Sequence, residues 1–358
     1  MITRSLVRVA CISLAFSLLL VGCKTKEKSD ESKAVTTKKA SAKAKSVAVD
    51  KALLAAFAPL PTQMKSDKNP ATEPKVALGR MLYYETRLSK ANDLSCNSCH
   101  QLAKFGVDGE ATSPGHKGQR GGRNSPTVYN AAGHLAQFWD GRSPDVEDQA
   151  KGPILNPIEM AMPDAKTVVA LLKGIPGYVA AFKAAFPADK DPVTYDNLGR
   201  AIGAFERNLV TPSRWDKFLQ GDAKALTDAE KKGFLAFVEV GCPTCHAGAY
   251  VGGAMYQKLG LVKPWPNQKD QGRFAVTKKD ADKMFFKAPS LRNIAKTGPY
   301  FHDGGTKSLE DAVALMGTHQ LGKTLKKEKL ASIVVWLKSL TGTLPTAYIK
   351  KPALPAGK

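Results

Sequence analysis

The chain has 358 residues, and its 53 lysines and arginines outnumber its 32 aspartates and glutamates, which gives a net charge of +21. This length exceeds what a single hydrophobic core usually serves, so a one-core fold is disfavoured. The positive charge favours acidic partners and anionic surfaces, although solubility alone would also account for it.

The first 23 residues have the pattern of an export signal. Arg4 and Arg8 supply positive charge, residues 9–20 form an apolar run, and the sequence Leu-Val-Gly-Cys that ends at Cys23 resembles a lipoprotein processing site. A permanent membrane helix is the alternative, but the run is too short to span a bilayer. We predict a lipoprotein signal peptide over 1–23 and a lipidated Cys23. The protein would then be periplasmic or extracytoplasmic, with a lipid as its only membrane anchor.

Residues 24–50 are rich in lysine, serine, threonine and alanine and contain no aromatic residue. Such a composition cannot bury enough apolar surface to fold. We expect a disordered, lysine-rich tether between the anchor and the folded part.

Two copies of the motif Cys-x-x-Cys-His follow, one in each half of the rest of the chain. Each motif offers two thiols for the vinyl groups of one porphyrin and an adjacent imidazole for its iron, which is the signature of c-type haem attachment. A zinc ribbon needs its cysteine pairs much closer together, and a dithiol redox motif does not explain the histidines. Two covalently bound haem c groups are therefore predicted. Their ligands are Cys96, Cys99 and His100 for the first, and Cys242, Cys245 and His246 for the second.

A helical pattern precedes each motif and closes each half. Thr227 and Glu230 form a capping box that would start the helix before the second motif. The intervening stretches are rich in glycine, proline and asparagine, so long loops are expected around the haems. The apolar positions of the four helices are Ala77, Met81, Tyr84 and Leu88; Leu198, Ile202, Phe205 and Leu209; Phe234, Phe237 and Val238; and Leu330, Ile333, Val334, Leu337 and Leu340.

This order of helix, motif, loops and helix is that of a cytochrome c fold, and it occurs twice. We predict a mainly α protein with two cytochrome c-like haem domains, long loops and haems that face a shared interface. The expected parts are a first haem domain over 51–211, a second over 212–343, and a tail over 344–358 that is open to packing back on the first domain.

Beyond the haem motifs, the chain resembles the bacterial dihaem cytochrome c peroxidases over essentially everything after the tether. The resemblance rests on an ordered set of short motifs in both halves. They are Cys96-Asn-Ser-Cys99-His100, Arg123-Asn-Ser-Pro-Thr127, Phe138-Trp-Asp-Gly-Arg142, Gly152-Pro-Ile-Leu-Asn-Pro-Ile-Glu-Met160, Pro289-Ser-Leu-Arg-Asn293, Pro299-Tyr-Phe-His-Asp-Gly304 and Met316-Gly-Thr-His-Gln-Leu-Gly322.

The resemblance implies an enzyme that reduces hydrogen peroxide to water with single electrons from a small donor protein, either a cytochrome c or a cupredoxin. The first haem would be the peroxidatic one, and the second would receive electrons. Nucleic acid is not an expected partner, because an exported dihaem protein has little access to it. The family often forms homodimers, so a homodimer is one state open to this chain.

For the first haem, the resemblance implies that His116 is a removable sixth ligand of the resting iron. His116 lies in a loop with several glycines, which can move at little cost. Glu159 would shuttle the proton of bound peroxide, Gln149 would orient the peroxide, and Phe138 would line the same pocket. From the residues alone, a surface histidine is the better interpretation of His116 and a solvated charge that of Glu159, so both roles depend on the resemblance.

For the second haem, a methionine opposite the histidine raises the reduction potential. Met316 lies in a glycine-containing loop before the closing helix, where a cytochrome c supplies its methionine, and it matches the ligand position of the family. The alternative is that Met316 packs in the core and His319 or another group binds the iron. His302 would support the surroundings of this haem, and His134 has no predicted role.

Between the domains, the resemblance places Trp139 on the electron path and a calcium ion on Asn124 and the backbone carbonyls of Thr297 and Pro299. Oxygen ligands suit such a hard cation. Two rival functions stay open. One is a sister enzyme that oxidises residues of a partner protein and has a tyrosine at the Met316 position, and the other is a dihaem electron carrier without chemistry of its own.

Overall fold

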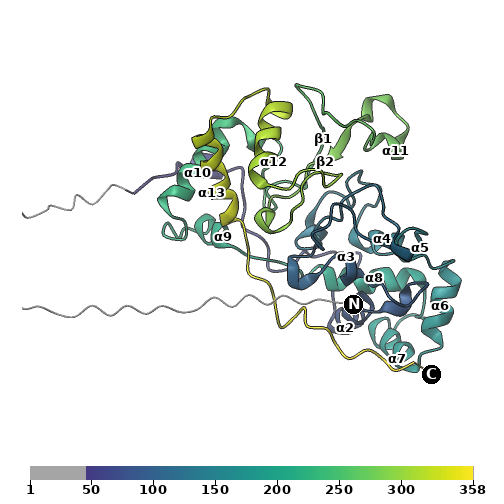
Figure 1. Cartoon of the computed structure of the whole chain (residues 1–358). Helices are drawn as coiled ribbons and strands as arrows, with labels where there is room; N and C mark the ends of the chain where they lie inside the picture. Colours follow the sequence, from purple (N-terminus) through teal and green to yellow (C-terminus); the bar gives the residue numbers. More distant parts are fainter. Residues whose placement is uncertain (1–45, 358) are drawn as a thin grey trace, which may run out of the picture. The chain divides into compact units, whose positions relative to one another are not determined.

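The structure is a computed structural model that describes residues 46–357 (Figure 1). The predicted signal peptide, Cys23 and most of the predicted tether lie outside these residues. The described part is mainly helical, as predicted. Its helices and strands are α1 (Lys51–Leu54), α2 (Glu73–Tyr83), α3 (Cys96–Cys99), α4 (Val146–Gln149), α5 (Gly152–Leu155), α6 (Ala165–Lys173), α7 (Pro176–Ala185), α8 (Tyr195–Glu206), α9 (Arg214–Leu219), α10 (Asp228–Val240), β1 (Tyr256–Lys258), α11 (Phe274–Thr277), β2 (Phe285–Lys287), α12 (Leu309–Leu315) and α13 (Lys327–Ser339).

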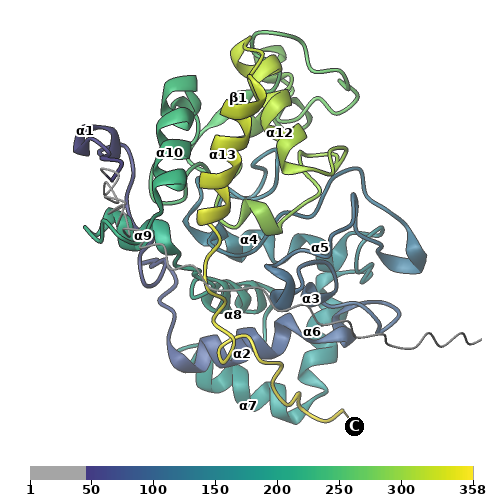
Figure 2. The same cartoon turned by 60° about the vertical axis from the view of Figure 1, so that its left-hand side comes forward.

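Each half is organised by one pair of crossing helices, α2 with α8 and α10 with α13 (Figure 2). Both pairs cross at a glycine. A Cβ on Gly79 would lie 1.9 Å from the carbonyl oxygen of Ala201, and a Cβ on Gly233 would lie 2.1 Å from that of Ser332. Only glycine, which has no Cβ, leaves room for such a close approach of two helices. The two halves therefore pack their helix pairs in the same way, as well as having the same order of elements.

Two separate hydrophobic cores follow from these pairs. The first runs from Leu78 to Leu209 along the chain, and the second from Trp215 to Leu340. The ends of the described chain cross over. Phe57 belongs to the second core although it precedes the first haem motif, and Ile349 of the tail is buried in the first. Figure 1 shows the tail running from α13 down to α7. The predicted domain boundaries stay a prediction. They do not describe Phe57 or Ile349, each of which packs in the core of the other half.

The predicted helices are present, and the capping box of Thr227 and Glu230 is formed in both directions. One prediction was wrong in detail. The expected apolar face of the first helix included Ala77, which is exposed, whereas the helix buries Leu78 and Leu82. The helix also ends at Tyr83, so its buried face lies one position away from the predicted one.

The only regular sheet in the described residues is a two-stranded antiparallel one, β1 with β2, in which Gln257 faces Phe286. Its second strand contacts a loop of the first half, because the backbone N–H of Lys287 donates to the carbonyl of Trp139 at 2.8 Å. This sheet therefore connects the second half to the segment that carries Phe138 and Trp139.

Within residues 46–357, no single helix has the length and hydrophobicity needed to cross a membrane. Helices α6 and α7 meet that requirement only as a pair, across a bend of 103°. Their buried side chains, such as Leu172 and Phe182, belong to the first core.

Candidate active site

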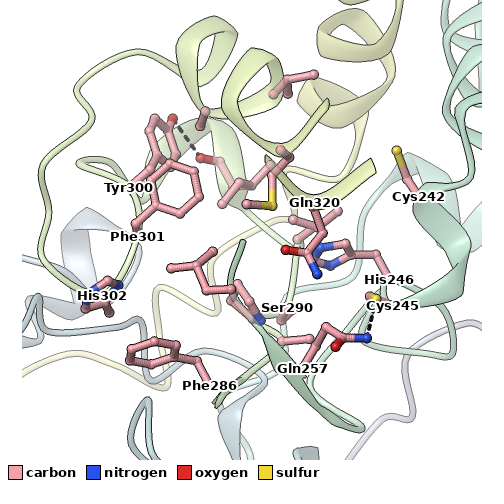
Figure 3. A pocket seen from close by; sticks show the side chains of 18 of the residues that line it. Cys242, Cys245, His246, Gln257, Phe286, Ser290, Tyr300, Phe301, His302 and Gln320 are labelled. Atoms are coloured by element: carbon pink, nitrogen blue, oxygen red, sulfur yellow. Dashed lines mark hydrogen bonds between the residues drawn. The ribbon is translucent and has the colours of Figure 1, made fainter. Parts of the chain in front are cut away.

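The second haem motif follows α10 and opens onto a cavity of about 230 Å³ with a mostly apolar wall. Cys242, Cys245 and His246 all line it, and Figure 3 draws their side chains among those of the wall. Both thiols are free. Burial lowers the pKa of His246 to about 4, which keeps the ring neutral, the form that binds iron. Two thiols and a neutral imidazole on one apolar cavity fit a haem c.

Met316 lies on the wall of this same cavity, at the start of a single π-helical turn that spans Met316–Gln320. His319, the alternative ligand, does not line the cavity. Its Nδ1 lies 3.0 Å from the carbonyl oxygen of Pro264, and its ring packs edge-on against Trp265. The geometry therefore favours Met316 over His319 as the group opposite His246.

His302 and His134 also line the second cavity. The His302 ring stacks on Phe286 with centroids 4.4 Å apart, and burial lowers its pKa. The half-buried His134 ring lies edge-on against Tyr250, and loss of solvent together with the nearby charge of Lys287 lowers its pKa well below the ordinary value. Both rings are therefore neutral parts of the cavity wall.

The first haem motif forms α3, and its histidine is oriented by a backbone group. The Nδ1 of His100 lies 2.9 Å from the carbonyl oxygen of Pro126. That contact makes Nδ1 the protonated nitrogen and leaves Nε2 free for a metal. The backbone carbonyl of His100 accepts a hydrogen bond of 2.8 Å from Tyr83 of α2. With Cys96 and Cys99 beside it, neither of them in a disulfide, this histidine fits the proximal side of the first haem c.

A separate cavity of about 410 Å³ is lined by Glu159 and Phe138 and by no residue of the first motif. Glu159 is nevertheless near that motif, because burial and, to a smaller extent, the charge of Glu159 raise the pKa of Cys99 to about 11. The carboxylate of Glu159 accepts a hydrogen bond of 3.0 Å from the side-chain amide of Asn156. Burial raises the pKa of Glu159 above its ordinary value, and the charge of Arg142 opposes that rise. Gln149 is not on this wall. It is half-buried at the end of α4, next in sequence to the lining residue Asp148.

His116 is buried and sits directly on the segment that carries Glu159. Its backbone N–H donates to the carbonyls of Ile158 and Glu159, at 3.0 and 2.8 Å. Its Nδ1 is buried and has no hydrogen-bond partner among residues 46–357. A Cβ on Gly115 would lie 2.0 Å from the carbonyl oxygen of Ile158, so the loop is tightly docked here. The glycine-containing loop is therefore docked at Gly115 and His116, whereas a Cβ on Gly118, Gly121 or Gly122 would meet open space.

Phe138 lines both cavities, and Trp139, the next residue, lines the second. The Trp139 indole N–H donates to the carbonyl of Asn124 at 2.9 Å, and its ring lies edge-on to His302 with centroids 6.5 Å apart. Phe138 has a left-handed φ of 64°, which is uncommon for a bulky residue and shows that the surrounding contacts fix this turn. Phe138 thus lies between the two cavities, with the Trp139 ring next to it on the side of the second haem motif.

Asn124, Thr297 and Pro299 all lie on the wall of the second cavity. The side-chain amide of Asn124 donates to the carbonyl of Glu110 at 3.0 Å, which leaves the amide oxygen for another partner. Among the described residues, no group of three or more histidine, cysteine, aspartate or glutamate side chains could hold a metal ion. A cation here would thus depend on an amide oxygen, backbone carbonyls and water.

Two residues of this region had no predicted role. Arg142 lines the first cavity, and its guanidinium carbon lies 3.4 Å from the ring centroid of Phe138. Asn156 orients Glu159. Both stand in motifs that carry the family resemblance, so their positions were visible in the sequence, but the reason for them is a contact that sequence does not show.

Two haem c motifs, an apolar cavity at the second of them, and a separate cavity that holds a half-buried carboxylate are the features of a dihaem redox protein with a site for chemistry. Comparison with known proteins agrees. The family model of the di-haem cytochrome c peroxidases matches residues 73–224. The cytochrome c551 peroxidase of Pseudomonas aeruginosa is 47% identical over 309 residues, which cover 84% of this chain and 88% of that protein. The cytochrome c551 peroxidase of Nitrosomonas europaea is 46% identical over 299 residues, or 82% and 87%.

Among solved structures, a MauG-like protein associated with microbial copper homeostasis is similar, with a TM-score of 0.72 and 29% identity over 82% of this chain and 97% of that one. The chain belongs to the di-haem cytochrome c peroxidase family. It is a peroxidase that carries two haem c groups and acts on hydrogen peroxide with a cytochrome as electron donor. Homologous cytochrome c peroxidases are periplasmic.

Proposed function

We propose that the two haems divide the work, with peroxide reduced at the first haem and electrons received at the second. One observation carries this division. A half-buried carboxylate, Glu159, lies on the first cavity, whereas a thioether, Met316, lies on the second. A carboxylate suits proton transfer to a substrate, and a thioether opposite histidine saturates an iron and raises its potential.

The haem groups supply the redox chemistry when bound, and the chain supplies position and proton transfer. Glu159 takes a proton from the near oxygen of bound peroxide and returns it to the far one, because hydroxide is otherwise a poor leaving group. Asn156 holds the carboxylate for this step. Gln149 orients the peroxide, and Phe138 limits the water in the cavity. Two electrons and two protons then convert one peroxide to two waters.

His116 is the proposed gate of the first site. Its buried ring, whose Nδ1 has no hydrogen-bond partner among the described residues, would bind the iron of the first haem in the resting protein and would be released when the second haem is reduced. Because its backbone is bonded to the carbonyl of Glu159, release of the loop would also reposition the catalytic carboxylate. Substrate access and catalytic geometry would thus change together.

Trp139 is the proposed route for electrons between the haems, and calcium is the proposed interdomain ion. The two sites are in contact, because the indole N–H of Trp139 donates to the backbone carbonyl of Asn124 at 2.9 Å. Asn124, Thr297 and Pro299 would bind the ion with the help of water. A calcium ion there would hold the Trp139 ring in place.

The donor is proposed to be a small acidic cytochrome c or a cupredoxin, drawn by the net charge of +21. Cys23 is proposed to carry the lipid that holds the protein to a membrane. A homodimer is the proposed assembly.

Steady-state consumption of peroxide with a reduced small cytochrome tests this function. The half-reduced, calcium-loaded protein should turn over, and the absence of turnover would favour the dihaem electron carrier. Oxidation of a protein substrate in place of the cytochrome would favour the sister enzyme, although the methionine at position 316 argues against it.

A further inference from the structure

Met316 and Gln320 stand at the two ends of the π-helical turn that follows α12, and both line the cavity of His246. Turns of this kind are rare and frequently mark functional sites. Figure 3 labels Gln320 and His246 among the side chains of the cavity wall. The segment that carries the proposed ligand is thus not part of a regular α-helix. Contacts from outside the turn must therefore fix its backbone.

Gln320 is bonded through its side chain to the edge of β1. Its Oε1 accepts a hydrogen bond of 3.2 Å from the backbone N–H of Gly260, and its Nε2 donates one of 2.9 Å to the carbonyl of Lys258. The amide therefore pairs with one N–H and one carbonyl of the backbone, as a neighbouring strand would. Both of its polar atoms are used.

Residues 258–265, which we term the brace, also form hydrogen bonds to the backbone of the turn. The carbonyl of His319 accepts hydrogen bonds from the backbone N–H groups of Val262 and Lys263, both at 3.1 Å. The brace is itself tightly folded. Gly260 has a φ of +76°, and a Cβ there would lie 2.4 Å from the backbone nitrogen of Trp265. The brace is therefore a firm support, and Gln320 is the side chain that ties the cavity end of the turn to it.

We propose that Gln320 is a positioning residue that holds Met316 in place at the second haem. The inference rests on the proposed ligand role of Met316. A methionine side chain has three rotatable bonds and adapts easily, so its sulfur is presented reliably only if the backbone that carries it is fixed. Without the Gln320 amide, the turn keeps its bonds at His319 but loses its attachment to β1, and the thioether leaves the iron more readily.

The test compares Gln320→Leu with Gln257→Leu in the dihaem protein. Gln257 is a matched control, because it lines the same cavity but its amide lies 3.8 Å from the sulfur of Cys245 and does not touch the turn. Two measurements apply. One is the reduction potential of the second haem, together with the red absorption band of methionine-bound ferric haem c. The other is the affinity of the second haem for imidazole, which competes with methionine.

We expect Q320L to weaken the band, to lower the potential of the second haem and to bind imidazole about tenfold more tightly, as the loss of two hydrogen bonds implies. The potential of the first haem should stay unchanged, which a general loss of structure would not allow. Because Gln257 contacts Cys245 but makes no hydrogen bond to the turn, Q257L should keep the methionine band and the imidazole affinity of the wild-type protein. Equal potentials and imidazole affinities in Q320L and Q257L would overturn the proposal.

A second variant guards against misfolding. Gln320→Glu keeps the acceptor for Gly260 but places a carboxylate oxygen against the carbonyl of Lys258, so it should shift the same quantities in the same direction. Met316→Ala distinguishes failure of the Met316 ligand assignment from failure of the Gln320 proposal. If M316A leaves potential and band unchanged, the ligand assignment and this proposal both fail. If M316A changes them and neither Gln320 variant does, only this proposal fails.

Discussion

Arg123 and Asp270 form a two-pronged ion pair that joins the two halves of the protein. The Nε and Nη2 groups of Arg123 donate to the two carboxylate oxygens of Asp270, at 2.6 and 2.9 Å. Arg123 also donates to Asp140 at 2.5 Å. Because Arg123 precedes Asn124 and Asp140 follows Trp139, this one side chain fixes both segments that we propose to carry calcium and electrons.

Replacement of Asp270 by asparagine should loosen this junction. Burial alone would raise the pKa of Asp270, but the hydrogen bonds from Arg123 hold it below the ordinary value, so the ionised pair is the favoured form. Since both side chains are partly exposed, we expect D270N to lower the free energy of unfolding by about 1–2 kcal/mol. Electron transfer between the haems should also slow. Chemical unfolding and flash-induced interhaem kinetics measure the two effects.

The exposed pair of Arg120 and Glu110 provides the control for this variant, because about half of each side chain is in water. Glu110→Gln should change neither stability nor interhaem transfer by a measurable amount. An unchanged transfer rate in D270N would show that the ion pair does not position the electron path.

The glycines at the two helix crossings should not tolerate a methyl group. Alanine usually stabilises a helix relative to glycine by about 1 kcal/mol. At Gly79 and Gly233, however, the added Cβ would meet a backbone carbonyl, which cannot move aside. We expect G79A and G233A to destabilise the protein by about 1–3 kcal/mol. Gly121→Ala, where a Cβ meets open space, is the control. Equal unfolding midpoints for all three variants would contradict the close-packing explanation.

The helical fold could be predicted because its signals are local. Leu198, Ile202 and Phe205 repeat at helical spacing, and all three are fully buried. The crossings at Gly79 and Gly233 could not be predicted, because a glycine within a helical pattern carries no sign of the chain that approaches it. The crossover of Phe57 to the second core was hidden for the same reason, since it depends on contacts far apart in the sequence.

The candidate site was predictable to the extent that motifs mark it. The six haem-attaching residues are fixed by their spacing, and the family motifs include Glu159 and Met316. The support around them was not visible. Two features arise from tertiary packing, which no local sequence pattern reveals. They are the brace that holds the Met316 turn and the position of Phe138 on two cavities.

Replacement of Glu159 by glutamine should remove proton transfer and leave the shape of the first cavity intact. We expect the rate of peroxide reduction to fall by about 10²–10⁴-fold, the usual contribution of a general acid–base residue. Binding of a neutral ligand to the first haem should change little. Stopped-flow mixing of the half-reduced enzyme with peroxide measures the rate. Asp148→Asn is the matched control, because that carboxylate lines the same cavity, and an equal loss in both variants would argue against a specific role for Glu159.

Removal of the His116 ring should make the fully oxidised enzyme reactive without prior reduction. If the ring closes the resting site, H116A leaves the sixth position of the first iron open in every oxidation state. The variant should bind peroxide before any electron is added, whereas the unchanged protein should require reduction of the second haem. Absorption spectra of the oxidised proteins mixed with peroxide distinguish the two. A need for reduction that persists in H116A would mean that another group closes the site.

Glu206 should make stability fall as the pH rises through the neutral range. Its side chain is buried in α8, and burial, followed by the charge of Glu147, raises its pKa to about 8. Below the unfolded pKa of about 4.5 both states hold the proton, and folding is not penalised. Between the two values only the folded state keeps it, so stability is lost at up to about 1.4 kcal/mol per pH unit until the folded pKa is passed. Glu206→Gln should flatten this part of the profile, measured as the free energy of unfolding from pH 5 to about 8. An identical slope in both proteins would mean that Glu206 is already ionised in the fold, with a charge partner that burial alone does not reveal.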